Sequence, residues 1–254
     1  MSVTVIKVGG SLQKSKNLNA LCAQLGNIGK HHRILIIPGG GFFADAVRNS
    51  AQSFDLDQDA SHWMAILAMN QYGYLLSSLI PHSICTENLD EALNCADKYQ
   101  PVILLPYKLM KGKDPLPHSW DVTSDSIAAW IAEYIKAERL VLVKSTDIPA
   151  KSWDKHDSRL PVDLEKLKGT DIVDPMFCEI IKKIKEQSEN VSLSSFPRRR
   201  ESKDQTIPWI PAYAEITKKN YKSNPRQPPE TSLWIINGNY SDQLTDLFNH
   251  LKIT

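Results

Sequence analysis

The sequence has few cysteines, and none of them is arranged as metal ligands usually are. The four cysteines, at positions 22, 85, 95 and 178, include no C-x-x-C pair, and none has a histidine at metal-ligand spacing. This pattern indicates reduced thiols in an intracellular protein and gives no metal-binding residues. No basic segment followed by a long apolar run opens the chain, and no apolar run approaches the length that spans a membrane. We therefore expect a cytoplasmic protein without a signal peptide.

An excess of charge of one sign is also lacking. The 254 residues include 30 basic and 29 acidic side chains, which gives a formal net charge of +1. No strong field therefore favours a nucleic acid or a membrane surface as partner. With 42% hydrophobic residues, the chain is long enough for one large α/β domain or two small ones.

Two common nucleotide-binding patterns, G-x-x-x-x-G-K-[ST] and G-x-G-x-x-G, are absent, so a nicotinamide site is a poor fit. Instead, strand-like segments at 3–8 and 33–37 each run directly into glycines, Gly9-Gly10 and Gly39-Gly40-Gly41. Amphipathic helices follow, over 18–28 and from about 43 to 48. These units predict parallel βαβ architecture. The glycines let backbone N–H groups approach a ligand, although a tight turn alone also explains them.

Residues 101–135 place carboxylates beside this architecture. The apolar run at 102–105 is typical of a strand buried on both faces, and a helix with one apolar face begins near Ser124. Asp121 and Asp125 therefore lie between a strand's carboxyl end and a helix's amino end, where α/β folds bind anions. An anion shares that space with carboxylates only if cations stand between, so we expect lysines and Mg²⁺ nearby. The alternative is that both aspartates only cap the helix.

Two lysines at strand positions are candidates for these cations. Lys7 interrupts an apolar strand two residues before the first glycines, which favours a buried anionic partner over a solvent-facing side chain. Lys144 ends a further strand that begins at residue 139, and Ser145-Thr146-Asp147 follows it at the same sheet edge. A role beside a nucleotide and a solvated strand end both remain open for Lys144.

A long helix is expected from Asp59 to Leu79, with the stripe His62, Ile66, Met69 and Gly73 on one face. Stripes of this kind usually belong to a core, and the functional alternative is that His62 and its neighbours line a ligand pocket. Further helices are expected near 89–96, 164–167, 179–185 and 243–251, and a last strand at 233–236.

The composition changes at 196–230, which holds six of the chain's 15 prolines, the triplet at 198–200, and eight basic against four acidic residues. No strand or helix period holds there, so we expect a surface insertion over 194–230, partly disordered. The sequence of this segment resembles translated copies of a short repetitive DNA element of bacterial genomes. Such an insertion would have no role in binding or catalysis. The alternative is that the arginines bind an anionic partner.

Together these segments resemble the amino acid kinase family, which includes aspartate, glutamate and uridylate kinases. The matching segments, in the family's order, are Lys7-Val8-Gly9-Gly10-Ser11, Pro38-Gly39-Gly40-Gly41, 121–128 and 143–147. The resemblance implies an α/β fold: a single domain over 1–254, built as a three-layer αβα sandwich around a mostly parallel eight-stranded sheet. It also implies transfer of the γ-phosphoryl group of ATP, with Mg²⁺, to a small acceptor, and a homo-oligomer.

The resemblance also implies roles for individual residues. Lys7, Gly10 and Asp125 would be catalytic: Lys7 neutralises the transferring group, Gly9-Gly10 hold it by backbone N–H, and Asp125 organises the lysines. The nucleotide site would comprise Lys7, Gly9, Gly10, Ser11, Lys144, Ser145, Thr146 and Asp147. The acceptor site would comprise Gly39, Gly40, Gly41, His62, Asp121 and Thr123. One departure is Ile148-Pro149-Ala150, where many relatives have Val-Asp-Gly in the loop on the adenine side.

Within the family, the segments at 103–106, 118–126 and 234–238 are most similar to the aminomethylfuran phosphate kinases of methanofuran biosynthesis. This implies [5-(aminomethyl)furan-3-yl]methyl phosphate as acceptor and a diphosphate as product. A uridylate kinase is the alternative, but such enzymes carry arginine-glycine after the tripled glycine. Here Phe42 to Arg48 follows, and we expect no arginine to hold a nucleotide's phosphate. A binding protein without catalysis on the same fold is a third alternative.

Overall fold

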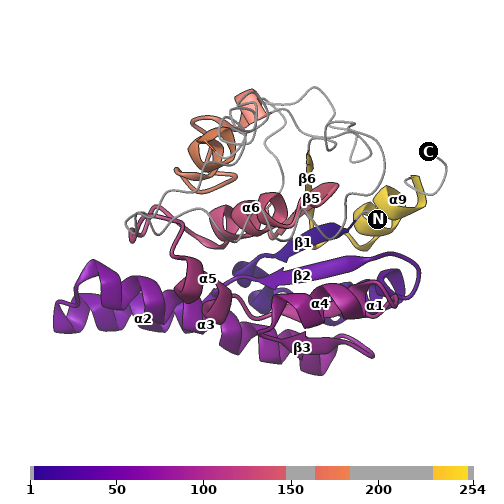
Figure 1. Ribbon diagram of the computed structural model, residues 1–254, viewed down its shortest axis with the longest axis horizontal. Helices are drawn as coiled ribbons and strands as arrows, with labels where there is room; N and C mark the ends of the chain where they lie inside the picture. The colour runs from indigo at the N-terminus through magenta and orange to yellow at the C-terminus, as the bar shows by residue number, and fades with distance from the viewer. Residues whose placement is uncertain (1–2, 147–163, 184–230, 251–254) are drawn as a thin grey trace, which may run out of the picture.

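The computed structural model describes residues 3–146, 164–183 and 231–250, which form one parallel sheet with helices on both faces (Figure 1). The strands are β1 (Thr4–Val8), β2 (Ile34–Pro38), β3 (Ile84–Thr86), β4 (Val102–Leu104), β5 (Arg139–Lys144) and β6 (Ser232–Asn237). Their order in the sheet is β3-β4-β2-β1-β5-β6, and every neighbouring pair is parallel. The expected parallel βαβ architecture is therefore confirmed.

The central strands form because their sequences suit burial on both faces. Every residue of β1 and β2 is buried, and both strands consist mostly of β-branched or leucine side chains. In the register, Val8 of β1 faces Pro38 of β2 on one side and Val143 of β5 on the other. The glycine segments that follow β1 and β2, and the residues that follow β5, therefore leave the sheet at the same edge.

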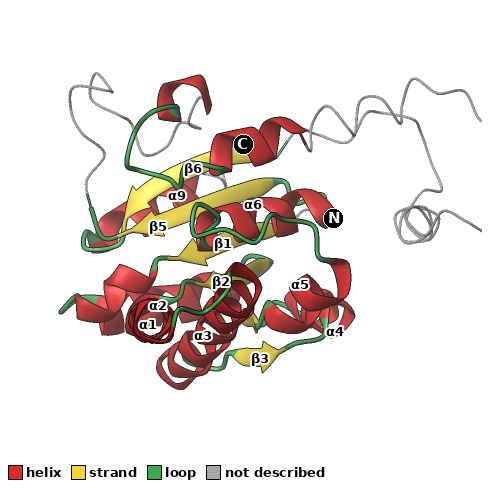
Figure 2. Cartoon of the chain, turned by 90° about the vertical axis from the view of Figure 1, so that its left-hand side faces the viewer, coloured by secondary structure: helices red, strands yellow, loops and turns green. Residues whose placement is uncertain are grey.

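Helices enclose the sheet in a three-layer arrangement (Figure 2). The α-helices are α1 (Leu18–Gly29), α2 (Gly41–Phe54), α3 (Gln58–Leu79), α4 (Leu89–Ala96), α5 (Tyr107–Lys113), α6 (Ser124–Tyr134) and α9 (Ser241–His250); η1 (Gly10–Lys14) and η2 (Leu164–Leu167) are 3₁₀ helices, and residues 177–183 are also helical. One apolar core joins the sheet to α1, α9 and the second half of α3. The other joins its opposite face to α4, α6 and residues 177–181.

The described part of the chain differs from the sequence-based expectation in several elements. It contains six strands, so the eight strands implied by the family resemblance are not shown. Strand β3 and helix α5 were not expected, and α2 continues to Phe54 instead of ending near Arg48. The expected insertion at 194–230 lies outside the described residues, as do Asp147 and the segment 148–150.

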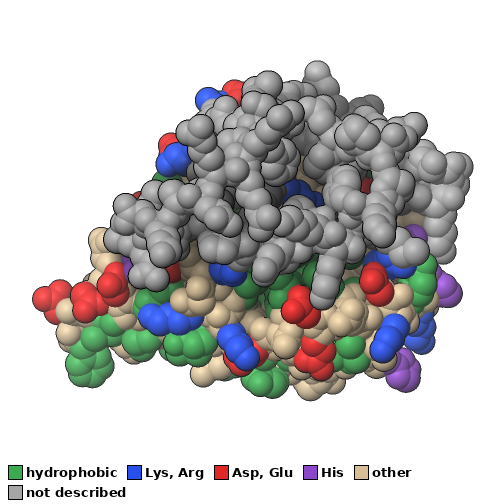
Figure 3. All heavy atoms as spheres, in the orientation of Figure 1, with side chains coloured by type: hydrophobic (Ala, Val, Ile, Leu, Met, Phe, Trp, Pro, Cys, Tyr) green, Lys and Arg blue, Asp and Glu red, His purple; other side chains and the backbone are tan. Residues whose placement is uncertain are grey.

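The face shown in Figure 3 carries described side chains of both charges. On the face in Figure 3, the basic and acidic side chains of the described residues are interspersed, which agrees with the formal net charge of +1. No helix in the described ranges has both the length and the hydrophobicity to cross a membrane. All four cysteines are free thiols, and burial raises the pKa of Cys22 to about 12. Among the described residues, no group of three histidine, cysteine or acidic side chains is placed to hold a metal.

Candidate active site

One buried carboxylate joins two lysines at the carboxyl edge of the sheet. Asp125, in the first turn of α6, places Oδ1 2.8 Å from Nζ of Lys7 on β1, and its Oδ2 accepts a hydrogen bond from Nζ of Lys144 at the end of β5. Lys7 and Asp125 are only 4% and 3% exposed. The structure therefore brings together the three charged residues that the sequence singled out from three separate elements.

In this cluster, the carboxylate of Asp125 and the ammonium groups of the two lysines stabilise one another's charges. Burial alone would raise the pKa of Asp125, but the two ammonium groups reverse that effect and hold the pKa below its usual range. Burial lowers the pKa of Lys144, helped by the charge of Lys7 and opposed by Asp125. With both lysines protonated, the cluster carries one net positive charge. Such a buried site is suited to an anion that arrives at the sheet edge.

Neither aspartate caps α6, so the capping alternative is wrong. Thr123 is the N-cap residue, and its hydroxyl accepts a hydrogen bond from the backbone N–H of Asp125 at 3.3 Å. Asp121 is exposed, and one of its carboxylate oxygens accepts a hydrogen bond from the hydroxyl of Ser119 at 3.1 Å.

A further aspartate, Asp174, secures the start of α6 from outside the helix. Its Oδ2 accepts from the backbone N–H of Thr123 and of Ser126, each at 3.1 Å, and from the Thr123 hydroxyl at 2.8 Å. Its Oδ1 accepts from the Ser126 hydroxyl at 2.6 Å. Asp174 is 8% exposed and precedes a helical stretch that packs into the core. It therefore fixes the turn that carries Asp125, and sequence patterns alone did not single it out.

The two glycine segments touch one another beside the charged cluster. A Cβ on Gly10 would lie 2.1 Å from the backbone nitrogen of Gly41, and one on Gly39 would lie 2.4 Å from the nitrogen of Gly10. Gly41 has φ +57, a left-handed conformation that glycine adopts without strain. A tight turn alone does not require such close approach of two separate backbone segments. The contact between the two segments therefore requires glycine at positions 10 and 39.

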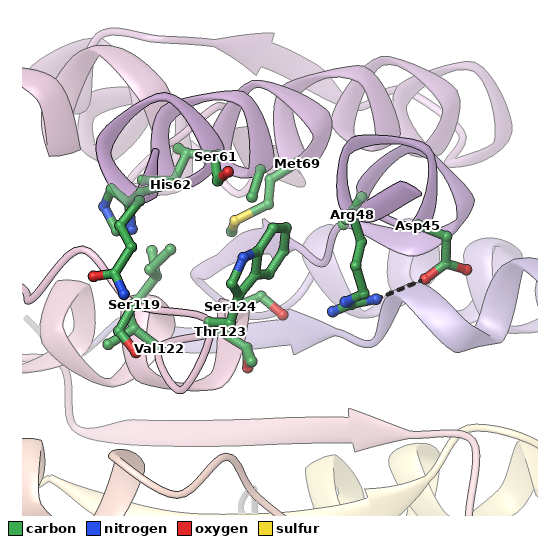
Figure 4. A pocket seen from close by; sticks show the side chains of 16 residues that line it. Asp45, Arg48, Ser61, His62, Met69, Ser119, Val122, Thr123 and Ser124 are labelled. Atoms are coloured by element: carbon green, nitrogen blue, oxygen red, sulfur yellow. Dashed lines mark hydrogen bonds and ion pairs between the residues drawn. The ribbon is translucent and has the colours of Figure 1, made fainter. Parts of the chain in front are cut away.

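A cavity of about 160 Å³ lies next to this edge, between α2, α3 and the start of α6 (Figure 4). It is lined by Gly40, Ala44, Asp45, Arg48, Gln58, Ser61, His62, Ala65, Ile66, Met69, Ser119, Trp120, Val122, Thr123, Ser124 and Ile127. Three of the expected acceptor residues, Gly40, His62 and Thr123, belong to this lining. Asp121, Gly39 and Gly41 do not, although the two glycines flank Gly40.

The helical stripe on α3 serves both the core and the cavity. Ile66 and Met69 are buried in the core beside the sheet and also line the cavity. His62 is 7% exposed, and Figure 4 shows it at one end of the cavity. Residues of the stripe are therefore part of the core and also line a cavity.

Arg48 lies at the opposite end of the cavity from His62 (Figure 4). Its guanidinium group is 4.9 Å from the ring centre of Trp120, and it pairs with Asp45 at 3.2 Å. The sequence showed no obvious arginine for an acceptor phosphate, but the fold places Arg48 in the lining of this cavity. Arg48 comes seven residues after Gly41, and the helical turns of α2 return it to the cavity that Gly40 lines.

The expected nucleotide side is only partly described. Ser145 is half-buried and Thr146 is exposed, while Asp147 lies outside the described residues. Asn239, in the turn after β6, was not expected: its side-chain N–H₂ donates to the carbonyl of Ser145 at 2.7 Å, and its Oδ1 accepts from the hydroxyl of Ser15 at 2.6 Å. The turn after β6 therefore links the segment after β5 to the segment after β1.

Comparison with known proteins agrees with this geometry. The family model described as "Amino acid kinase family" matches residues 2–149, more than half of the chain. The chain belongs to the amino acid kinase family.

Two individual relatives are each less than 30% identical in sequence to this chain. The chain is 28% identical over 183 residues to a [5-(aminomethyl)furan-3-yl]methyl phosphate kinase from Methanocaldococcus jannaschii, covering 71% of this chain and 83% of that protein. It is 26% identical over 151 residues to a uridylate kinase from Methanothrix thermoacetophila, covering 57% of this chain and 63% of that protein. The crystal structure of uridylate kinase from Archaeoglobus fulgidus aligns with a TM-score of 0.52 at 20% identity, covering 73% and 88% of the two chains, which shows the shared fold.

Proposed function

We propose that this protein transfers the γ-phosphoryl group of MgATP to the phosphate of [5-(aminomethyl)furan-3-yl]methyl phosphate. An oxygen of the acceptor phosphate forms the new bond to the γ-phosphorus as the bond to the β,γ-bridging oxygen breaks, which gives ADP and a diphosphate. The observation that carries the kinase proposal is the Lys7–Asp125–Lys144 cluster, which lies at the same sheet edge as the two touching glycine segments.

The residues at this edge fit a triphosphate. Phosphoryl transfer needs reactants held in line and charge neutralised on the transferring oxygens, and little else from the protein. In the proposal, Lys7 and Lys144 supply that charge, and the backbone N–H groups of Gly10 and Ser11 hold the phosphates. The N–H of Gly9, expected from the family resemblance to do the same, instead donates to the carbonyl of Val143 at 2.9 Å. Asp125 keeps the two ammonium groups in place, and Mg²⁺ enters with ATP, whose oxygens supply most of its ligands. Ser145, Thr146 and Asp147 are proposed to contact the nucleotide beyond its phosphates.

The order of polar groups along the cavity supports the proposed acceptor. It carries a phosphate at one end, a flat furan ring, and an aminomethyl group that is protonated at neutral pH. Arg48 and Gly40 offer a phosphate site at one end of the cavity, and His62 offers a polar group at the other. Met69 and Trp120 supply apolar walls between them. The relative from Methanocaldococcus jannaschii supports this choice of acceptor.

Uridine monophosphate is the second candidate acceptor, because Arg48 at the cavity offers the phosphate partner that the sequence did not reveal. The similarity to uridylate kinases supports it as well. The furan phosphate kinase matches more of this chain than the uridylate kinase from Methanothrix thermoacetophila, 71% against 57%, and at slightly higher identity. We therefore favour the furan phosphate.

The test compares kcat/KM for the furan phosphate and for uridine monophosphate, with MgATP saturating and product formation followed by ³¹P NMR. We expect the furan phosphate to be preferred, and the Lys7→Ala variant to lose turnover while still binding ATP. A tenfold preference for the nucleotide, about 1.4 kcal/mol in transition-state binding, would overturn the acceptor and leave the kinase. Binding of ATP without turnover of any acceptor would instead support a binding protein. Light scattering on the same sample tests the expected homo-oligomer.

A further inference from the structure

An imidazole ring held between two carboxylates lies behind the His62 end of the cavity. His118, in the segment between α5 and α6, places Nδ1 2.6 Å from an oxygen of Asp59 and Nε2 2.7 Å from an oxygen of Asp114. Ionised carboxylates only accept hydrogen bonds, so both ring nitrogens must donate, which requires the imidazolium form. These two hydrogen bonds raise the pKa of His118. His118 is therefore a fixed positive charge with a set ring orientation.

This ring stacks on His62. The two ring centres are 4.3 Å apart and the planes differ by 18°, while the edge of Trp63 contacts both rings at 4.9 Å. Two stacked imidazoles repel one another if both are charged. Burial, together with the charge of His118, lowers the pKa of His62 to about 4. His62 is therefore neutral at physiological pH, and one of its nitrogens keeps a lone pair that accepts a hydrogen bond.

The charged groups around His62 come from each element that packs against it. Asp59 belongs to α3, and Asp114 is the C-cap residue of α5. His118 lies in the segment between α5 and α6. Lys111 of α5 lies over the ring of Trp63, with its Nζ 4.0 Å from the ring centre. Two carboxylates, the imidazolium of His118 and the ammonium group of Lys111 sum to zero charge.

The remaining charged side chains of the cavity, Arg48 and Asp45, lie at the far end (Figure 4). The His62 end thus combines a neutral hydrogen-bond acceptor with charged groups that balance one another. The lone pair of His62 can accept from an N–H of an ammonium group, whereas an ionised phosphate or carboxylate has no hydrogen to donate.

We infer that His62 accepts a hydrogen bond from the ammonium group of the acceptor, and that His118, held by Asp59 and Asp114, is the positioning residue that orients His62. The inference rests on the proposed function, because that acceptor supplies the ammonium group. It assigns the two ends of the cavity to the two ends of the acceptor, with the phosphate towards Gly40 and the amine towards α3. Selection for the amine then occurs far from the reacting phosphate.

The catalytic test uses the furan phosphate and an analogue in which a methyl group replaces the aminomethyl group. His62→Phe keeps a ring against His118 but has no lone pair. We expect it to lower kcat/KM for the amine acceptor tenfold or more, mainly through KM, and to leave the analogue within about twofold. His31→Phe, an exposed histidine on α1's side of the protein, is the matched control and should change neither value. Equal losses for both acceptors, or no loss, would overturn the inference.

A pH profile separates positioning by His118 from simple packing. His118→Phe preserves a stacked ring but removes the positive charge that helps to keep His62 neutral. The acidic limb of kcat/KM for the amine acceptor should therefore move from near pH 4 towards higher pH. An unmoved limb would contradict the positioning role.

Direct observation of the rings keeps this test separate from catalysis. In ¹⁵N-detected NMR of the wild-type protein at pH 7, His118 should be doubly protonated and His62 neutral, and 5-methylfurfurylamine should shift the His62 signals. Absence of turnover with the furan phosphate refutes the proposed function alone. Absence of the His62 shift refutes the amine subsite, whatever the enzyme phosphorylates.

Discussion

Asp125→Asn is the substitution that most directly probes how the phosphate edge is built. It keeps the size of the side chain but removes the charge that compensates the ammonium groups of Lys7 and Lys144. Both interactions are at least largely buried, so water does not replace the lost carboxylate. The variant therefore leaves two like charges close together without a counter-ion.

Breaking a buried ion pair by removing one partner typically costs about 3–5 kcal/mol. We expect a loss of stability in this range near pH 7, because the carboxylate serves both lysines. The loss should shrink as the pH rises, because burial lowers the pKa of Lys144, which can then lose its proton in the folded variant while the unfolded chain keeps it up to about pH 10. In steady-state kinetics, the activation free energy should rise by about 2–4 kcal/mol, which lowers kcat roughly 30- to 900-fold. The affinity for ATP should change less.

Urea unfolding at several pH values and steady-state kinetics measure these effects. Asp97→Asn is the matched control: it makes the same chemical change at a half-exposed carboxylate that pairs with Arg33 at 3.2 Å, and should cost about 1 kcal/mol or less. If Asp125→Asn were as stable as the control, or kept near wild-type kcat, the carboxylate would not organise the lysines. A stability deficit that did not change with pH would show that lost packing, not uncompensated charge, is the cause.

Three further outcomes are expected. Asp174→Asn should cost about 1–3 kcal/mol in urea unfolding, since it turns an acceptor of four hydrogen bonds into a partial donor facing donors, and unchanged stability would contradict its role at α6. Gly10→Ala should lower soluble yield and kcat because its Cβ meets backbone at 2.1 Å, whereas Gly112→Ala, with nothing within 4 Å, should fold normally. Replacing residues 194–230 by a short linker should preserve soluble expression and turnover, and an insoluble product would show that the segment contributes to the fold.

The sequence predicted the buried centre of the fold better than its margins. Strands β1, β2 and β5 were predicted because continuous apolar runs suit burial on both faces. Strand β3 was missed because its three residues, Ile84–Thr86, lie at the sheet edge and only Thr86 is buried, so they carry no period. Helix α5 was missed because Pro106, Gly112 and several lysines obscure its single buried residue, Met110.

In the candidate site, too, the sequence revealed some residues and not others. Lys7, Asp125 and the glycines stood out because each breaks the local pattern of an apolar strand or an amphipathic helix. Asp174 carries no local signal: its partners are at the start of α6, 48 and 51 residues earlier. The stacking of His62 on His118 is equally invisible, since only the packing of α3 against the segment before α6 brings the two rings together.

The place of β6 in the sheet has a consequence for the order in which the chain is made. Strand β5 ends at Lys144 and its outer partner β6 begins at Ser232, almost 90 residues later. At typical synthesis rates of about 5–20 residues per second, the growing chain waits roughly 5–20 s for that partner. During this interval the apolar edge of β5 has unpaired backbone groups, which is a template for aggregation. Each residue inserted before β6 lengthens this period of exposure. A longer segment at this place therefore increases the risk of aggregation during synthesis more than it lowers the stability of the finished protein.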